Sequence, residues 1–501
     1  MQEVSGSIPL SSILNFIKSS QCLELASFFF ILTKKWVLKM ELLKNFNAFI
    51  WNYITIFMLG AGIYFTIKTK FAQLTMLPEM FKLVTQGIGK KVNGISGFQA
   101  FCVSLASRVG VGNIAGVAIA IVTGGPGAVF WMWVTAFFCC STSFVECTLA
   151  QIYKIPNKDG TFYGGPAYYM KNVLKQPILA YIFSVLMCFM FCMVYSVQAN
   201  TITISTYTAF NINRMGMTIF LCLVTALTVF GQMKGVAKIS EKMVPIMAFM
   251  YIISAIIVSI MNFDKIPQAI YLIFHDAFSP NAVLGGGIGT VVMTGVRRGI
   301  FSNEAGVGSV PNAAATADAS HPVQQGFIQS FGVYVATFFV CGATAFIILL
   351  TGKYNLGDGP TGIELAQDSL GVCFGNIASQ ILSIIIFLFA FSTIIGNYYY
   401  AEIIIAFFKH DNNKLYMNIF RVIVIITVFI GGLQDLSLVW ESTDLIMGFL
   451  CITNIYAILR LSKYSFEALN DYIEQKKSGI EEPIFDSTKI SNSDGIFSWK
   501  K

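Results

Sequence analysis

The recurrence of long apolar stretches is what most limits how this chain can fold. A segment of about 20 apolar residues can cross the hydrocarbon core of a bilayer as a helix, and such segments recur along all 501 residues. Only 12% of the residues are charged, about half the share in a soluble domain. No series of alternating segments dominates, as a membrane β-barrel would require. The sequence therefore predicts an all-α polytopic membrane protein.

Eleven spans can be placed, one leading span followed by two sets of five. The leading span is 48–67, and the first set comprises 96–123, 125–153, 177–209, 216–233 and 240–261. The second set comprises 283–317, 323–351, 376–408, 416–433 and 440–461. We expect an N-terminal extension at 1–47, the leading span with a basic segment at 48–95, five-helix repeats at 96–261 and 283–461, and a tail at 462–501.

Basic residues gather in alternate connections between the spans. The net charge is +7, and lysines cluster after the leading span, after residue 153 and after residue 233. This pattern is the positive-inside signature of membrane topology, and we favour it over a patch that binds nucleic acid. It predicts a multi-pass protein of the plasma membrane with a cytoplasmic C-terminus. The charged tail from about 463 is expected to be a partly ordered cytoplasmic end.

The N-terminal extension does not fit this topology. Lys34, Lys35 and Lys39 would lie outside, and the apolar run 23–32 is too short to span. One interpretation is an extension lying on the membrane surface. The other, which we favour, is that the protein starts at Met40.

Two of the spans are interrupted by polar and glycine residues. RVGVGNIAG (108–116) and VRRGIFSNEAGVG (296–308) share an Arg, then four residues, then Asn, one residue and Ala-Gly-Val. Each stretch belongs to the first span of its set of five. Because five is odd, the second copy enters the membrane from the opposite side. Paired interruptions in an inverted repeat indicate the binding site of a transporter.

Glycine lets each helix unwind near the middle of the bilayer. The freed N–H and C=O groups are tolerated only where they line a polar cavity or a ligand. Freed N–H groups suit a carboxylate, and freed carbonyls suit a small hard cation, so a zwitterion and a metal cation would use both. The alternative is that GNIAG (112–116) is a small-residue packing motif. The neighbouring charged and amide residues make packing alone a poor explanation.

Ionisable residues inside membrane spans are expensive and are usually functional. We expect the acids to pair with the arginines as structural or gating bridges, in preference to direct contact with a substrate. The candidates are Arg108, Glu146, Arg297, Arg298, Glu304 and Glu402.

Two uninterrupted spans carry polar faces, and each is the third of its set. Gln198 lies at helical spacing from Tyr195 and Thr201. Ser392 and Thr393 lie one turn before Asn397. Hydroxyls in membrane helices usually bond to a carbonyl one turn earlier. Adjacent hydroxyls that face a broken helix would instead be natural ligands of Na⁺.

These residues resemble the alanine/glycine:cation symporter family. The resemblance covers about 45–475, and its most specific motif is GGPGAVFWMWVTAFF at 124–138. Further matches are DGTFYGGPAYYM (159–170), FSNEAGVGS (301–309), HPVQQG (321–326) and FAFSTIIGNYYYAE (389–402). Membership would imply the LeuT-like fold, with two inverted five-helix repeats and two discontinuous helices, and Na⁺-driven uptake of alanine or glycine.

The resemblance also implies which residues form the two sites. Carried over, the Na⁺ site comprises the carbonyls of Val109 and Gly112 with the hydroxyls of Ser392 and Thr393. The amino acid would lie beside Gly112, Asn113, Gln198, Phe301, Thr393 and Asn397. The chain departs from the family at Val111 and Ile119, where Thr is common, and at Cys139 and Ala401, where Gly is common. The Val111 change removes a hydroxyl from the break itself.

The predicted function is Na⁺-coupled symport of a small neutral amino acid by alternating access. Alternatives are an H⁺-coupled symporter of the same fold, with Glu304 or Glu146 titrating, and a channel or sensor that does not cycle. The 11 cysteines fall mostly in apolar spans and resemble small buried hydrophobes. We expect no enzyme chemistry, no cofactor apart from the coupling ion, and a monomer.

Overall fold

The computed structural model describes residues 20–89, 94–157, 160–279, 289–354, 362–408, 414–434 and 437–499. The chain divides into two compact units, Met1–Ile50 and Trp51–Lys501. A single helix, α2 (Ser20–Lys68), runs from the first unit into the second. The larger unit contains every candidate site residue. Both interpretations of the N-terminal extension remain expectations, and residues 1–19 lie outside the described residues.

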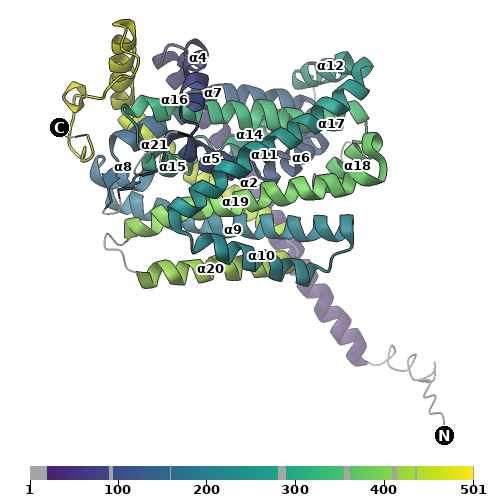
Figure 1. The fold of residues 1–501 in the computed structure, drawn as a ribbon. Helices are drawn as coiled ribbons and strands as arrows, with labels where there is room; N and C mark the ends of the chain where they lie inside the picture. The colour runs from purple at the N-terminus through teal and green to yellow at the C-terminus, as the bar shows by residue number, and fades with distance from the viewer. Residues whose placement is uncertain are drawn as a thin grey trace, which may run out of the picture. The chain divides into compact units, whose positions relative to one another are not determined.

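Helices make up almost all of the described chain (Figure 1). Eight are long and apolar enough to cross a membrane, or nine if the bent pair α5 and α6 is one span, within the residues described. The protein is therefore a membrane-embedded, multi-pass helical protein. The predicted spans of the first set correspond to α5 (Gly97–Arg108), α6 (Ala115–Gly124), α7 (Gly127–Ile152), α9 (Pro177–Phe210), α10 (Arg214–Val229) and α11 (Gln232–Met261).

The second predicted set has the same order of elements. Its helices are α14 (Thr290–Asn303), α15 (Val310–Thr316), α16 (Pro322–Val333), the π-helix η3 (Tyr334–Cys341), α17 (Gly342–Thr351), α19 (Ala378–Phe408), α20 (Lys414–Leu433) and α21 (Ser437–Lys477). Within the described residues, each predicted span overlaps a helix or a broken helix. The connection 280–288, with part of the glycine run GGGIG, lies outside the described residues.

Short elements fill connections for which the sequence predicted no structure. They are α3 (Ala72–Thr75), α4 (Leu77–Gln86), the antiparallel pair β1 (Ile155–Pro156) and β2 (Phe162–Tyr163), α8 (Pro166–Asn172), α12 (Ile266–Ala277) and α18 (Gly362–Phe374). Helix α12 buries Ala269 and Ile273 while Tyr271 and Phe274 stay exposed. An amphipathic helix of this kind lacks the continuous apolar run from which the membrane spans were predicted.

The packing brings the two predicted sets together. Helix α7 packs against α14 and α16 of the second set, and α19 packs against α9 and α5 of the first. Helices α9, α10 and α20 lie side by side (Figure 1). Helices from both sets therefore surround the broken helices.

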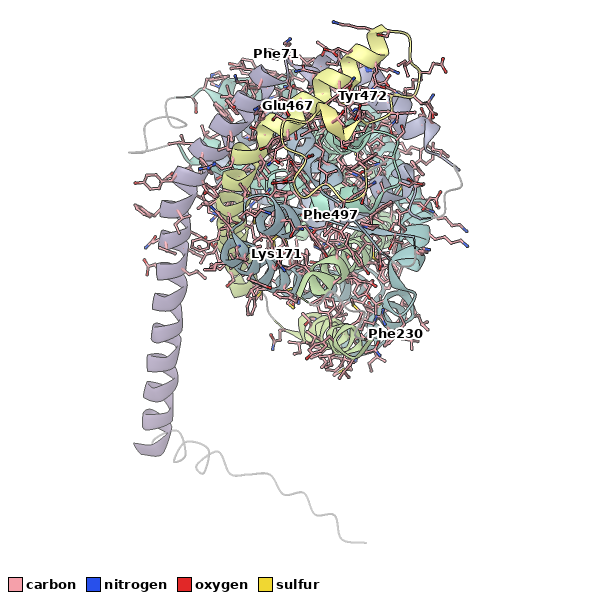
Figure 2. All side chains as sticks on the ribbon, turned by 90° about the vertical axis from the view of Figure 1, so that its left-hand side faces the viewer. Phe71, Lys171, Phe230, Glu467, Tyr472 and Phe497 are labelled. Atoms are coloured by element: carbon pink, nitrogen blue, oxygen red, sulfur yellow. The ribbon has the colours of Figure 1, made fainter. Side chains whose placement is uncertain are left out.

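The C-terminal part differs from the expectation of a partly ordered tail. Helix α21 continues 16 residues past the predicted end at 461, to Lys477. The following residues, including the short 3₁₀ helix η5 (Ser487–Lys489), fold back on the protein and bury Phe485, Ile490 and Ile496. Figure 2 shows Phe497 of this tail near Lys171 of α8, and both residues line one surface pocket. Apolar residues spaced along a charged segment allowed the tail to pack.

Candidate functional site

The first broken span bends by 62° between α5 and α6. Helix α5 ends at Arg108, Gly110 is extended, and a single 3₁₀ turn, η1 (Val111–Asn113), leads into α6. The glycines also make room for other helices. A Cβ on Gly110 would lie 2.4 Å from Oγ1 of Thr393. A Cβ on Gly112 would lie 2.4 Å from Cε1 of Phe301. The break is therefore the place where α19 and α14 approach the α5–α6 backbone.

The second broken span is interrupted between α14 and α15. Gly306 and Gly308 have φ of 82° and 88°, in the left-handed region that glycine adopts freely. Glu304 also has a positive φ, of 53°. This conformation costs a non-glycine residue about 1–2 kcal/mol. It persists because the side chains around it hold the segment, as backbone strain at functional sites usually requires.

The two predicted cation ligands on α19 face the first break. The Ser392 hydroxyl lies 3.2 Å from the Ala106 carbonyl oxygen. The Thr393 hydroxyl lies 3.0 Å from the same oxygen and 3.4 Å from that of Ser107. Both hydroxyls also donate to the Phe389 carbonyl one turn earlier. All these oxygens are buried, so hydroxyl and carbonyl oxygens converge at the last turn of α5.

The carbonyls at this point are not the ones that the resemblance implied. We expected Val109 and Gly112, whereas the α19 hydroxyls meet carbonyls of Ala106 and Ser107. The reason is the close approach of Thr393 to Gly110, which places the α19 hydroxyls beside the end of α5. Gly112 instead lies against the ring of Phe301.

Several predicted substrate residues border the first break. The Gln198 side-chain oxygen accepts the N–H of Val111 at 3.3 Å, so it already binds a freed backbone donor. The Asn397 amide donates to the Thr393 carbonyl at 2.9 Å. Phe301 closes the opposite side of Gly112, and its ring centroid lies 5.4 Å from that of Trp440. Gln198 of α9 and Phe301 of α14 therefore contact this turn of backbone, and Asn397 lies one turn beyond Thr393 on α19.

The Asn113 side chain is held by hydrogen bonds beside the first break. Its amide nitrogen donates to the Ser302 hydroxyl at 3.2 Å and to the Ala336 carbonyl at 3.1 Å. Its backbone carbonyl accepts the Thr344 hydroxyl at 2.8 Å. Asn113 therefore fastens the break to α14 and to the helices that follow it. Its amide nitrogen is thus already bonded within the protein, and its predicted contact with a carboxylate stays a prediction.

Arg297 and Arg298 pair with an acid that the sequence reasoning missed. The Arg298 guanidinium lies 2.8 Å from the Asp444 carboxylate, and that of Arg297 lies 3.4 Å away. The indole N–H of Trp51 donates to the Asp444 carbonyl at 3.2 Å. Arg298 also lies over the rings of Phe301 and Trp440. The sequence did contain a signal for Asp444: it lies inside the last apolar span, where ionisable residues usually have a function.

The buried glutamates do not form the bridges that we expected with Arg108, Arg297 or Arg298. Glu146 accepts the N–H of Gly306 at 3.1 Å and the amide of Asn454 at 2.8 Å. Glu402 lies 4.0 Å from Arg421, which was not a candidate.

Glu304 and Arg108 likewise bind neutral groups. Glu304 accepts the hydroxyls of Ser107 at 2.9 Å and Ser309 at 2.5 Å. Arg108 donates to the Gln329 carbonyl at 2.8 Å and to the Ser143 hydroxyl at 3.1 Å. Among the described residues, no carboxylate lies within ion-pair distance of Arg108. Glu304, the acid of the second break, is hydrogen-bonded to serine hydroxyls instead.

Comparison with known proteins gives consistent relationships. The model of the sodium:alanine symporter family matches residues 35–487. The chain is 45% identical to the probable sodium/glutamine symporter GlnT of Bacillus subtilis, over 90% of this chain and 94% of that protein. It is 35% identical to the sodium/alanine symporter AgcS of Methanococcus maripaludis, over 84% and 94%. A solved Na⁺-coupled sialic acid symporter shares the fold, with a TM-score of 0.50, 13% identity and coverage of 85% and 86%.

Proposed function

Because the chain belongs to the sodium:alanine symporter family, we propose that it is a secondary transporter that carries a small neutral amino acid into the cell together with Na⁺. The observation that carries this proposal is the convergence of the Ser392 and Thr393 hydroxyls on the carbonyls of Ala106 and Ser107. Hard monovalent cations prefer such neutral oxygen ligands. We assign the Na⁺ site to these four residues.

The amino acid would bind beside the Na⁺ site, at the unwound turn. Gly112 and Gln198 offer backbone and amide groups for the carboxylate and ammonium, and Asn397 lies one turn beyond Thr393. Phe301 packs directly on Gly112, and its ring would limit the size of a side chain bound beside it. We therefore propose alanine and glycine as substrates. Glutamine is the competing candidate, since the relative at 45% identity is named for it.

We further propose eleven spans in the inverted five-plus-five arrangement, in the plasma membrane and with the C-terminus in the cytoplasm. The two breaks support this arrangement, since α5–α6 and α14–α15 occupy equivalent places in the two sets. We keep a monomer as the proposed oligomeric state. In such an arrangement the two broken helices move relative to the others as the site opens to alternate sides.

Uptake of radiolabelled alanine into proteoliposomes tests the proposal. An inward Na⁺ gradient should drive accumulation, and K⁺ in its place should not. Uptake driven by a pH gradient alone would replace Na⁺ with H⁺ as the coupling ion. Counterflow of labelled against unlabelled alanine should occur, because a carrier exchanges its substrate and a channel or sensor does not.

The cation ligands can be tested separately from the amino-acid site. Replacing Ser392 by Ala and Thr393 by Val should raise the Na⁺ concentration for half-maximal uptake about tenfold or more, because each lost oxygen contact is worth about 1 kcal/mol. The KM for alanine at saturating Na⁺ should change less. Ser383→Ala, another buried hydroxyl of α19, is the matched control. A larger effect on the alanine KM would contradict the assignment.

A further inference from the structure

A pocket with two lysines lies where the C-terminal tail meets the turn between α8 and α9. Its volume is about 400 Å³, within the usual range of small-molecule sites. Figure 2 shows two of its residues, Lys171 and Phe497, close together. None of the lining residues is acidic, so the pocket carries a net positive charge. They are Lys171, Asn172, Lys175, Pro177, Gly495 and Phe497.

The two lysines have no acidic partner. Within the part of the chain that the structure describes, no carboxylate lies within ion-pair distance of Lys171 or Lys175. The Lys171 ammonium lies instead over two aromatic rings, 5.3 Å from the centre of Phe407 and 5.8 Å from that of Tyr181. Both lysines are exposed. Their charge is therefore available to an anionic ligand.

The backbone fixes where the second lysine lies. Lys175 has a φ of 57°, in the left-handed region that a residue other than glycine rarely adopts. The turn is closed on both sides of it by backbone hydrogen bonds. The N–H of Leu174 donates to the Tyr169 carbonyl at 3.0 Å. The N–H of Gln176 donates to the Met170 carbonyl, also at 3.0 Å. A defined turn therefore presents the lysine at the pocket.

An exposed apolar stripe begins at the edge of the pocket. Pro177 lines the pocket and is also the first residue of α9, a helix long and apolar enough to cross a membrane. Ile178, Ile182, Val185 and Phe189 follow on α9 at helical spacing, and all four are exposed. In a membrane-embedded protein, an exposed apolar surface of this kind contacts lipid chains.

The C-terminal tail forms the other wall of the pocket. A Cβ on Gly495 would lie 3.2 Å from the Cγ2 atom of Val173, so the tail lies directly against the turn between α8 and α9. Phe497 is 50% exposed, although its neighbour Ile496 is buried. An exposed aromatic ring beside basic residues is typical of a surface that contacts lipid headgroups. The positive-inside pattern explains lysines in this connection, but it does not explain an apolar wall beside them.

We propose that this pocket binds the headgroup of an anionic phospholipid. The phosphate would lie between Lys171 and Lys175, the Asn172 amide would donate to it, and an acyl chain would follow the exposed stripe of α9. Basic pockets beside membrane helices bind such headgroups. A free phosphate could use the lysines but would leave the stripe unused, which is why we assign the pocket to a lipid. The proposal does not depend on the Na⁺ site or on the amino-acid site.

The test measures lipid binding to the purified full-length protein by native mass spectrometry. Phosphatidylglycerol should bind about tenfold or more tightly than phosphatidylcholine with the same acyl chains, because only the first carries a net negative charge. Lys171→Gln combined with Lys175→Gln should lower the affinity for phosphatidylglycerol about tenfold or more and leave that for phosphatidylcholine unchanged. Inorganic phosphate and glycerol phosphate should not displace the bound lipid.

Lys234→Gln combined with Lys238→Gln is the matched control. These two lysines are also exposed and also four residues apart, in the first turns of α11, so the pair removes the same charge from another basic segment. The control should keep the preference for phosphatidylglycerol. The lipid should also raise the thermal unfolding temperature of the unaltered protein and of the control, and raise it less in the variant of Lys171 and Lys175.

Three outcomes would overturn the proposal. Equal affinity for the two lipids would remove the role of charge, and an equal loss in the control pair would show that the lysines act only as part of the overall surface charge. Displacement of the lipid by inorganic phosphate would assign the lysines to a free anion. None of these results bears on Na⁺-driven uptake of alanine, which is measured separately.

Discussion

At the scale of single residues, the decisive features are pairs of groups that lie far apart in the chain. The sequence identified Arg297, Arg298 and Glu304 as costly residues inside a span. It did not identify their partners, because Asp444 lies 146 residues from Arg298 and Ser107 lies 197 residues from Glu304. An ionisable residue in an apolar span is a local signal. The group that neutralises it depends on which helices pack together.

Asp444→Asn tests the ion pairs at the single-residue scale. The change leaves Arg297 and Arg298 buried without an acid, so we expect a loss of about 3–5 kcal/mol in the free energy of unfolding. It should appear as a lower thermal unfolding temperature of the purified protein and as reduced uptake. Asp264→Asn, which removes an exposed acid, is the control. An unchanged unfolding temperature in Asp444→Asn would contradict this account.

At the scale of elements, the glycines of the first broken helix allow both unwinding and close packing, and the glycine pattern predicted only the unwinding. Glycine predicted that the helix could unwind, and the span does bend by 62°. The structure shows in addition that Gly110 and Gly112 admit the side chains of Thr393 and Phe301. Unwinding and close approach both require the absence of a Cβ. The sequence could indicate the first, because it is local, and not the second, because it depends on α14 and α19.

Gly112→Ala tests this contact between elements. The new methyl group would lie 2.4 Å from the Phe301 ring, so the ring must shift and the proposed amino-acid site must change shape. Alanine uptake should fall about tenfold or more, as overpacking of 1–3 kcal/mol implies. Gly116→Ala is a matched control in the same stretch, because its methyl group would make an ordinary 3.7 Å contact with Arg298.

Phe301→Ala tests the same contact from the other side. Removing the ring should enlarge the site and allow longer amino acids, glutamine included, to compete with radiolabelled alanine. Combined with Gly112→Ala it should restore part of the uptake, because the clash is removed. Unchanged selectivity in the single variant would move the amino-acid site away from Phe301.

At the scale of the whole molecule, the C-terminal tail packs on the end of α7. Trp499 donates its indole N–H to the Gln151 carbonyl at 2.8 Å. Its ring lies 4.6 Å from the Lys154 ammonium, which also lies over Phe162 and donates to the Ala317 carbonyl at 2.9 Å. Lys154 lies beyond the end of α7, and burial lowers its pKa to about 7.

This lysine predicts a pH-dependent stability. The unfolded chain holds the Lys154 proton up to about pH 10.5, whereas the folded protein releases it near pH 7. Between these values the unfolded state binds more protons, so the free energy of unfolding should rise with pH, by at most about 1.4 kcal/mol per unit. Below that window both states are protonated and the slope should vanish.

The measurement compares unfolding temperatures at about pH 7 and about pH 9. Lys154→Met should remove the rise, and Trp499→Ala should reduce it by admitting water. Lys463→Met changes an exposed lysine of α21 and should leave it unchanged. A rise that persists in Lys154→Met would assign the effect to another group.

The sequence alone determined the membrane class, the order of the helices and the two breaks, with ends within a few residues for most spans. These features follow from apolar length and glycine spacing, which are properties of short segments. Only the tertiary structure decided that Asp444 pairs with the arginines, that Ala106 and Ser107 face the α19 hydroxyls, and that the tail packs on α7. These contacts join residues that are far apart in sequence, and the packing of whole helices sets which of them meet.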